Sequence, residues 1–299
     1  MMEKTEFIKD FLDTHGIRFR DDALGSECTT FRTGGRIALF CEPDTVEKAS
    51  ELLSFIHEND VDSFLIGNGS NLLIGDSGSD KLFVRLAGEL AEYNMEGDTL
   101  ICGGGASFAA AAKHSVSQGY MGLEWASGIP GTVGGAIAMN ASAYGGETKT
   151  FLKKLLISNN GKTEEIVPDP EKMGYRVSAY AFPKAAVLRA EFKLIPDDGT
   201  AKDNMERYSQ KRKASQPLNY PSAGSTFKRP AGHFAGALIE QAGLKGLRVG
   251  GASVSEKHAG FIINDNGATS DEILELIGLV QKKVYDRFGV MLEPEVIIL

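Results

Sequence analysis

The segment GLEWASGIPGTVGGAIAMNASAYGGE, residues 122–147, decides how the rest of this chain is organised. It contains seven glycines among apolar residues such as Ile129 and Val133, and only two charges, Glu124 and Glu147. A flexible glycine linker is normally rich in serine, whereas this composition indicates a buried backbone with positive-φ turns. Consecutive N–H groups in such turns form concave sites for phosphate oxygens. A glycine-rich packing loop is the alternative that this segment alone leaves open.

The bulk composition describes a globular protein with many turns. The chain has 299 residues, of which 42% are hydrophobic, enough for two or three packed subdomains. Glycine accounts for 35 residues, about 12% where about 7% is usual, and follows no Gly-x-y period. The net charge of −8, with scattered lysine and arginine, argues against nucleic acid as the main partner. We expect a bound anion to be held locally by N–H groups and a few cations.

The three cysteines, Cys28, Cys41 and Cys102, indicate a reducing compartment. They are odd in number, widely spaced and lack metal-site spacing, so we expect inert thiols rather than disulfides. The N-terminus has no apolar signal core, and no apolar run approaches the ~18 residues of a membrane span. The sequence therefore predicts a cytoplasmic protein without a membrane segment.

Hydrophobic periodicity predicts helices and strands mixed along the chain, which is typical of an α+β fold. Asp44 with Glu47, and Thr269 with Glu272, have the spacing of capping boxes. Helices are expected over residues 5–15, 108–118, 201–213 and 234–242, from residue 44 onward and after residue 269. Strands are expected over residues 37–41, 63–66, 72–74, 82–86, 99–102, 152–158, 164–167, 186–194 and around 290–299.

Two turn signals divide the second half of the chain. Asn159-Asn160-Gly161-Lys162 lies between two expected strands and predicts a β-hairpin. Residues 196–199, PDDG, interrupt the periodic pattern, so we place a boundary there. We therefore expect a subdomain boundary between residues 197 and 198.

The turn GNGSNL, residues 67–72, fails the test for a Rossmann dinucleotide site. That fingerprint needs a third glycine and a following helix, but Leu72 occupies the third glycine position and a strand pattern follows. The interpretation that remains for this turn is a phosphate-binding site between two strands. Together with the first segment it suggests a bound dinucleotide of unspecified kind.

Several common catalytic classes lack their motifs here. The five histidines have no metal-ligand spacing, so we expect no metal site. A Walker lysine loop and a G-x-S-x-G elbow are also absent from the sequence.

Seven motifs in order resemble the UDP-N-acetylenolpyruvoylglucosamine reductase family of cell-wall synthesis. They cover nearly the whole chain, and SGIPGTVGG followed by GSTFKRP is the most specific pair. The motifs are TTFRTGG (29–35), IGNGSNLL (66–73), SGIPGTVGGAIAMNASAYGG (127–146), YRVSAY (175–180), AGSTFKRP (223–230), LKGLRVGGASVSEKHAG (244–260) and LEPEV (292–296).

The resemblance implies a flavoprotein with an FAD-binding fold of the vanillyl-alcohol-oxidase type. Residues 1–80 and 81–197 would be its two FAD-binding subdomains and residues 198–299 a C-terminal substrate domain. NADPH would be the reductant, and the enolpyruvyl ether of UDP-N-acetylglucosamine the substrate, reduced to UDP-N-acetylmuramate for peptidoglycan. No nucleic acid, membrane or obligate protein partner is implied.

The resemblance also implies which residues bind FAD, and most lie in the glycine-rich turns. They are Thr33, Gly34, Gly35, Gly67, Asn68, Gly69, Ser70, Asn71, Leu72, Ser127, Gly128, Ile129, Pro130, Gly131, Thr132, Val133, Gly134, Gly135 and Asn140.

Three residues match the catalytic positions of the family. Arg176 would bind the substrate carboxylate through its planar guanidinium as negative charge develops there. Ser225 would donate the proton to the neighbouring carbon. Glu295 matches the third position; Glu293 has the same facing under strand alternation, so only the motif distinguishes the two.

Four further residues are implied in substrate binding: Tyr175, Arg229, Lys257 and His258. Arg229 stands where many relatives have asparagine, His258 replaces a glutamine of some relatives, and Tyr180 replaces a frequent phenylalanine. The separation from Arg176 to Ser225 is 225 − 176 = 49 residues, too short for the tyrosine-bearing insertion of the longer subtype. The chain resembles the compact subtype.

Two rival functions remain to be considered. An alcohol oxidase of the same FAD fold would have no use for Arg176, Ser225 and Glu295. A non-catalytic nucleotide-sugar binding protein would keep the glycine turns and lose one of these three residues, whereas all three are present.

Overall fold

The computed structural model describes residues 2–299, and its contacts divide the chain into two compact units. Unit 1 comprises residues 1–21, 39–67 and 81–210. Unit 2 comprises residues 22–38, 68–80 and 211–299. Each unit is described by itself below. The three-region division at residues 80 and 197 stays a prediction.

The elements follow one another in an irregular mixture of helices and strands. The α-helices are α1 Met2–Thr14, α2 Gly25–Cys28, α3 Val46–Glu58, α4 Phe108–Ser117, α5 Val133–Ala138, α6 Ala201–Ser215, α7 Ala235–Gln241 and α8 Ser270–Phe288; the 3₁₀ turns are η1 Gly88–Ala91, η2 Glu124–Gly128, η3 Thr148–Thr150 and η4 Pro170–Lys172. The strands are β1 Arg18–Leu24, β2 Arg36–Glu42, β3 Ser63–Leu65, β4 Leu72–Leu73, β5 Ser79–Val84, β6 Tyr93–Glu96, β7 Thr99–Gly103, β8 Tyr120–Met121, β9 Ser142–Ala143, β10 Gly146–Glu147, β11 Leu152–Asn159, β12 Lys162–Ile166, β13 Met173–Gly174, β14 Val177–Ser178, β15 Ala185–Lys193, β16 Ile195–Pro196, β17 Arg248–Val249, β18 Ala252–Val254, β19 Ile262–Asn264 and β20 Ile297–Ile298.

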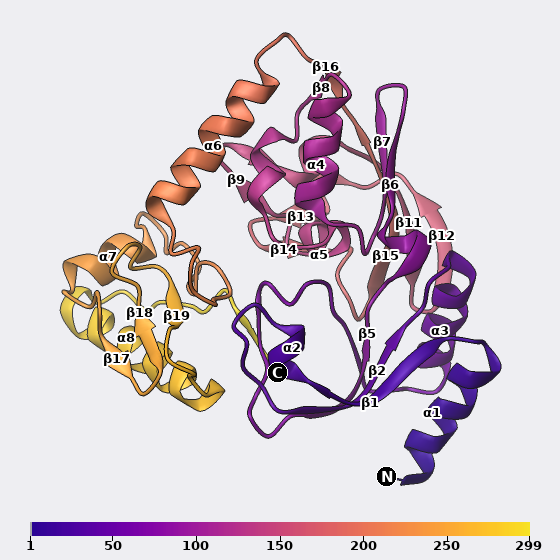
Figure 1. The fold of residues 1–299 in the computed structure, drawn as a ribbon, viewed down its shortest axis with the longest axis horizontal. Coiled ribbons are helices and arrows are strands. Elements are labelled where there is room, and N and C mark those ends of the chain that lie inside the picture. Colours follow the sequence, from indigo (N-terminus) through magenta and orange to yellow (C-terminus); the bar gives the residue numbers. More distant parts are fainter. Residues whose placement is uncertain (1) are drawn as a thin grey trace. The chain divides into compact units, whose positions relative to one another are not determined.

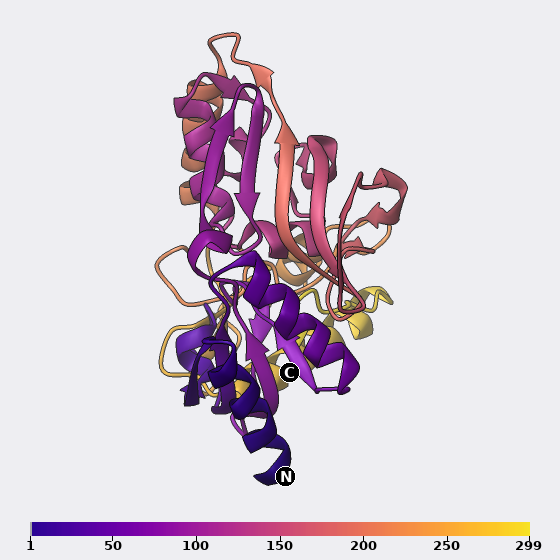
Figure 2. The ribbon, with the colours of Figure 1, turned by 90° about the vertical axis from the view of Figure 1, so that its right-hand side faces the viewer.

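An antiparallel five-stranded sheet with the order β12-β11-β15-β7-β6 forms the centre of unit 1 (Figure 2). Strands β11 and β12 form the predicted hairpin. Its two-residue loop is Asn160-Gly161, and both residues have positive φ, +48° and +77°. Turns with positive φ at both central residues match the twist of the flanking strands, and asparagine and glycine adopt positive φ more readily than other residues.

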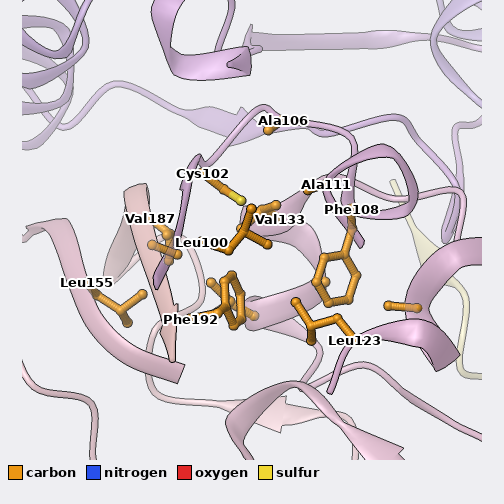
Figure 3. Packing of buried hydrophobic residues seen from close by; sticks show 14 of the residues in the cluster. Leu100, Cys102, Ala106, Phe108, Ala111, Leu123, Val133, Leu155, Val187 and Phe192 are labelled. Atoms are coloured by element: carbon orange, nitrogen blue, oxygen red, sulfur yellow. The ribbon is translucent and has the colours of Figure 1, made fainter. Parts of the chain in front are cut away.

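Helices α4 and α5 pack on one face of this sheet (Figure 1). Phe108 and Ala111 from α4 meet Leu100, Val187 and Phe192 from the strands in a closely packed cluster (Figure 3). Ser107 begins α4, and its side chain accepts a hydrogen bond from the N–H of Ala110 at 3.3 Å. The helix predicted over residues 108–118 is confirmed.

A second cluster in unit 1 packs α1 and α3 against strands. Leu12 of α1 and Leu52 of α3 are fully buried in it with Val84 of β5. A four-stranded sheet, β1-β2-β5-β3, carries most of its residues in unit 1, and β3 and β5 run parallel. This core holds the strand β3, after which the first phosphate-site turn begins.

Unit 2 is built on α8, whose apolar stripe packs on α7 and on the three-stranded sheet β17-β18-β19. The predicted capping box is confirmed: the Thr269 side chain accepts from the N–H of Glu272, and the Glu272 carboxylate accepts from the N–H of Thr269. Gly289 ends α8 with φ +69°. Strand β4 pairs in parallel with β20 near the C-terminus.

Two local predictions were wrong in detail. The N-cap of α3 is Thr45, which accepts from the N–H of Lys48 at 3.2 Å, whereas Asp44 pairs with the Lys48 ammonium at 2.8 Å. The segment after residue 290 is mostly irregular and contains only the short strand β20. Its apolar residues Leu292 and Val296 are buried by the unit 2 core rather than by a long ladder.

The three cysteines are buried and form no disulfide. Burial raises the pKa of the Cys102 thiol to about 12, and that of Cys41 is raised as well. The thiols of Cys41 and Cys102 are therefore protonated at neutral pH, and the inertness of the three cysteines stays a prediction. Within residues 2–299, none of the helices combines the length and the apolarity that crossing a bilayer requires.

Candidate functional site

The glycine-rich segment 122–147 forms four short elements, η2, α5, β9 and β10, and its glycines serve two purposes. Some allow close packing: a Cβ on Gly146 would lie 2.2 Å from Cδ1 of Trp125, and Gly122 has φ +125° against the ring of Phe151. The packing alternative therefore applies to this part of the segment. Two others, Gly134 and Gly135, line a cavity.

That cavity lies within unit 1, between the two cores described above. Its lining includes Gly67, Gly104, Gly105, Thr132, Gly134 and Gly135. Apolar side chains complete it, among them Leu86, Phe182 and Val187. A concave surface with an exposed backbone and apolar walls is the usual form of a cofactor site.

The N–H groups of residues 129–135 are mostly used within the protein. Val133 donates to the carbonyl of Ala106, Gly134 to that of Gly104, and Gly135 to the Thr132 hydroxyl. The N–H groups of Gly131 and Thr132 find no acceptor within residues 2–299. Only this part of the loop can therefore donate backbone hydrogen bonds to a ligand.

Gly67 meets Thr132 where the first turn passes the glycine-rich loop. A Cβ on Gly67 would lie 2.5 Å from Oγ1 of Thr132, well inside van der Waals contact. The same Oγ1 caps α5 by accepting from Gly135. Glycine at position 67 is therefore required for a steric reason that the turn pattern alone did not give.

The remaining predicted cofactor residues of the first two motifs lie in unit 2. Gly69 has φ +62°, and its carbonyl accepts from the N–H of Thr30 at 3.2 Å. The N–H groups of Gly69, Ser70 and Asn71 have no acceptor in the part of the chain that the structure describes. Three adjacent donors of this kind match the expected strand–turn–strand anion site.

Thr33 is buried, yet its hydroxyl lacks a hydrogen-bond partner. Buried hydroxyls are almost always satisfied, so an orphan of this kind marks a position that a ligand or water completes. Gly34 beside it has φ +113° and packs against Ile74, where a Cβ would come within 2.9 Å. Gly35 donates to the carbonyl of Gly75.

Asn140 is almost fully buried, and its side chain makes three bonds within unit 1. Nδ2 donates to Oε1 of Glu147 at 2.8 Å and to the carbonyl of Gly174 at 3.0 Å. Oδ1 accepts from the N–H of Lys149 at 3.2 Å. The cofactor-binding role predicted for Asn140 remains a prediction.

Arg176 occupies the turn of a short hairpin, β13–β14, that the periodicity did not reveal. The register Gly174↔Val177 leaves Tyr175 and Arg176 as the two turn residues. Arg176 has φ +57°, a left-handed conformation that is uncommon outside glycine, asparagine and aspartate. Its guanidinium lies 5.1 Å from the Tyr175 ring centre, and Nη1 donates to the Ser142 hydroxyl at 3.3 Å.

Within unit 2, Thr226 connects the segment that carries Ser225 to the segment that carries Glu295. The Thr226 carbonyl accepts from the N–H of Glu295 at 2.8 Å, and Phe227 forms a bridge with Pro294. The Thr226 hydroxyl accepts from the N–H of Ile262 at 3.0 Å. Ser225 therefore presents an exposed side chain beside the backbone of Glu295.

The two glutamates of LEPEV differ in surroundings. Glu293 is exposed and pairs with the ammonium of Lys228. Glu295 is half-buried, and its carbonyl accepts from Nδ2 of Asn71 at 3.1 Å. Asn71 belongs to the anion-site turn, so this bond connects that turn to the predicted catalytic segment within unit 2.

The predicted substrate residues are dispersed over surface segments. Tyr175 is exposed, and the guanidinium of Arg229 lies 4.6 Å from the Phe234 ring centre. Lys257 donates to the carbonyl of Lys213. Burial lowers the pKa of His258, so its imidazole is neutral at pH 7; Nδ1 accepts from the N–H of Gly260 at 3.1 Å.

Two residues of the cavity were not predicted from the sequence to bind a ligand. Arg85 lines it and has a buried Nε without a hydrogen-bond partner, while its guanidinium lies 4.8 Å from the Phe40 ring centre. Tyr180 is buried at the cavity, and its hydroxyl accepts from the N–H of Asp169 at 2.7 Å. No cluster of metal-ligating side chains occurs among residues 2–299.

Comparisons with known proteins match two domain models along the chain. Residues 37–166 match the model described as FAD binding domain, and residues 216–299 match the model described as UDP-N-acetylenolpyruvoylglucosamine reductase, C-terminal domain. The UDP-N-acetylenolpyruvoylglucosamine reductase of Syntrophomonas wolfei is 38% identical over 97% of this chain and 97% of its own length. That of Exiguobacterium sibiricum is 41% identical over 90% of this chain and 88% of its own.

The fold comparison agrees. The crystal structure of UDP-N-acetylenolpyruvylglucosamine reductase from Thermus caldophilus superposes with a TM-score of 0.82, at 33% identity, over 94% of this chain and 99% of that chain. The predicted α+β class and the FAD-binding fold of the vanillyl-alcohol-oxidase type are confirmed. The chain therefore belongs to the UDP-N-acetylenolpyruvoylglucosamine reductase family and is an FAD-containing oxidoreductase.

Proposed function

We propose that this enzyme uses NADPH to reduce the enolpyruvyl ether of UDP-N-acetylglucosamine to UDP-N-acetylmuramate, a precursor of peptidoglycan. The named relatives and their coverage of the whole chain support this reaction. We place the enzyme in the cytoplasm, because its substrate is a nucleotide-linked precursor and its three buried thiols suit a reducing compartment.

The residues present fit FAD. Unit 1 offers the cavity around Gly67 and Thr132, where the N–H groups of Gly131 and Thr132 are available to donate hydrogen bonds to a phosphate oxygen. Unit 2 offers the three adjacent N–H groups at residues 69–71 and the unsatisfied Thr33 hydroxyl. When bound, FAD supplies the hydride that the enolpyruvyl group receives.

Two tasks are then left to the protein. The carboxylate of the enolpyruvyl group gains negative charge as its double bond is reduced, so donors must already point at it. The carbon next to that carboxylate must receive a proton from a positioned acid.

Arg176 suits the first task. A guanidinium presents two parallel N–H donors to a carboxylate and stays charged at every physiological pH. Its left-handed backbone conformation costs free energy, on the order of 1 kcal/mol, and strain of this kind is commonly retained where a side chain must point in one direction.

Ser225 suits the second task, and the observation that carries the proposal is its fixed position beside Glu295. Thr226 accepts hydrogen bonds from the N–H groups of Glu295 and Ile262, and these two bonds hold the backbone immediately after the exposed serine. A hydroxyl is a weak acid, but the enolate carbon is basic enough to take its proton when the two are in contact. We propose that Glu295 also faces the developing enolate, and that Glu293, engaged by Lys228, does not.

The test is Ser225→Ala followed by stopped-flow absorbance of the flavin. Reduction by NADPH should proceed at the wild-type rate, because the serine has no part in that hydride transfer. Reoxidation by the enolpyruvyl substrate should slow by the ~10²–10⁴-fold typical of a lost proton donor. Ser225→Cys should recover part of the rate, because a thiol also carries a transferable proton.

Ser222→Ala is the matched control, since it removes a hydroxyl from the same segment, and the bond that Ser222 accepts from Thr30 goes to its backbone carbonyl. Equal slowing of both half-reactions in Ser225→Ala would indicate damage to the flavin site. Normal reoxidation would exclude Ser225 as the acid. Rapid reduction of the flavin by a small alcohol, with no response to NADPH, would favour the oxidase alternative.

Arg176→Lys tests the other task. Lysine retains the charge and loses the planar pair of donors, so kcat should fall far more than KM rises. If KM rises and kcat is unchanged, Arg176 only binds the substrate.

A further inference from the structure

The hairpin that carries Arg176 has little packing of its own. Strands β13 and β14 are two residues long, and Tyr175 and Val177 are 50% and 62% exposed. Met173, at the start of the hairpin, is the buried member and belongs to the core of the five-stranded sheet. Beyond Met173, the direction of the turn must be set by polar contacts.

Those contacts come from residues 140–149, which span the end of the glycine-rich segment and the two residues after it. Asn140 donates to the carbonyl of Gly174 at 3.0 Å, and the Lys149 ammonium donates to the carbonyl of Met173 at 2.8 Å. A third bond runs the other way, from Nη1 of Arg176 to the Ser142 hydroxyl at 3.3 Å. The two strand carbonyls before the turn and the guanidinium itself are thus all held by residues 140–149.

Asn140, Glu147 and Lys149 form one network, which we call the Asn140 network. Nδ2 of Asn140 uses both hydrogens, one on Glu147 and one on Gly174, and Oδ1 accepts from the Lys149 N–H. Asn140 is 1% exposed and has φ +39°, a conformation that asparagine tolerates better than most residues. The side chain is fully engaged toward the hairpin and its own loop.

We infer that Asn140 and Lys149 are positioning residues that orient Arg176 by holding the carbonyls of Met173 and Gly174. This inference rests on the proposed role of Arg176. It assigns to Asn140 a function other than direct contact with the cofactor. The physical reason is geometric: a small rotation of the two strands displaces the guanidinium at the end of the turn. Misplacement of a catalytic group by 1 Å costs about 10²-fold in rate.

Asn140→Asp is the main test, because it keeps the size of the side chain and its tolerance of positive φ while removing both Nδ2 donors. Reoxidation of the flavin by the enolpyruvyl substrate should slow by roughly 10- to 100-fold. FAD content and the rate of reduction by NADPH should stay at wild-type values. Asn160→Asp is the matched control: Asn160 is also an asparagine with positive φ, but it lies exposed in the β11–β12 turn.

Lys149→Met provides an independent second variant, because it removes the bond to Met173 and leaves the Asn140 side chain unchanged. It should slow the same half-reaction. Lys162→Met, at an exposed position in β12, is its control. Both variants of the network should also raise amide hydrogen exchange in the peptide spanning residues 172–179, a readout that needs no catalysis.

A double variant separates positioning from other effects. If Asn140 acts through Arg176, then Asn140→Asp should slow turnover no further once Arg176 is alanine, because the group being oriented is gone. Additive losses, or loss of FAD from Asn140→Asp, would overturn the inference and favour a direct cofactor contact. Unchanged turnover in Arg176→Ala would instead refute the proposed function of the arginine, which is a distinguishable result.

Discussion

Replacing Gly67 by alanine tests whether the cavity of unit 1 is fitted as closely as its geometry indicates. The new Cβ would lie 2.5 Å from Oγ1, 3.2 Å from Cγ2 and 3.4 Å from Cβ of Thr132. Of these three distances, only the 2.5 Å distance to Oγ1 is too short for any real side-chain contact. The loop can respond in two ways: Thr132 rotates, or the backbone shifts.

The structure sets the size of the effect. Rotation of Thr132 would break its bond from Gly135, an N-cap contact worth about 1 kcal/mol. A backbone shift in a packed region costs about 1–3 kcal/mol. Gly67→Ala should therefore lower the free energy of unfolding by roughly 1–3 kcal/mol. Thr132→Ala alone should lower it by about 1 kcal/mol.

The decisive variant is the double substitution. Thr132→Ala removes Oγ1 and Cγ2 and leaves the Cβ at an ordinary contact distance of 3.4 Å from the new methyl group. The double variant should therefore be no less stable than Thr132→Ala by itself, which is a strongly non-additive result. Urea unfolding followed by circular dichroism measures the three losses, and FAD titration of the same proteins gives affinity. Additive losses in the double variant would refute the steric reasoning.

Three further predictions follow from single features of the structure. In the native protein at pH 7, a thiol reagent should label none of Cys28, Cys41 and Cys102, because all are buried and the pKa of Cys102 is raised to about 12; all three should react after unfolding in urea. Asp265→Asn should destabilise by about 1 kcal/mol at pH 7, since the Arg248 guanidinium donates to both carboxylate oxygens at 2.7 and 2.6 Å. The hydrogen bond from Arg248 lowers the pKa of Asp265. The ion pair therefore stabilises the protein above the ordinary carboxyl range near pH 4, and this stabilisation is lost as the pH falls below that range. The difference in urea unfolding between variant and wild type should vanish in acid, and a difference that persists there would contradict the assignment. Thr269→Ala should cost about 1 kcal/mol in the same assay, because it removes the Thr269 side-chain contact of the capping box of α8. Thr14→Ala, at an exposed position at the end of α1, is a comparison that should cost less.

Several elements could be predicted from the sequence because their causes lie within a few residues. Asn160-Gly161 specifies its turn through its own backbone preferences, and Thr269 caps α8 through a residue three positions away. The failure at α3 is of the same local kind: Asp44 and Thr45 are adjacent candidates, and Lys48 attracts the carboxylate away from the cap. The family, and with it the FAD-binding domain, was likewise evident from ordered motifs in the sequence.

The rest depended on contacts between residues far apart in the chain. The residues around Gly67 do not indicate that Thr132 lies where a Cβ at position 67 would be. The residues around Asn140 do not indicate that its side-chain amide donates to the carbonyl of Gly174. Thr226 joins Ser225 to Glu295 only after the chain has closed into unit 2. The sequence by itself determined the family, the turn between β11 and β12 and the cap of α8, and it predicts which residues carry the chemistry. The tertiary structure decided which of those residues hold one another in place, because a hydrogen bond between distant segments exists only when the cores beneath them have packed.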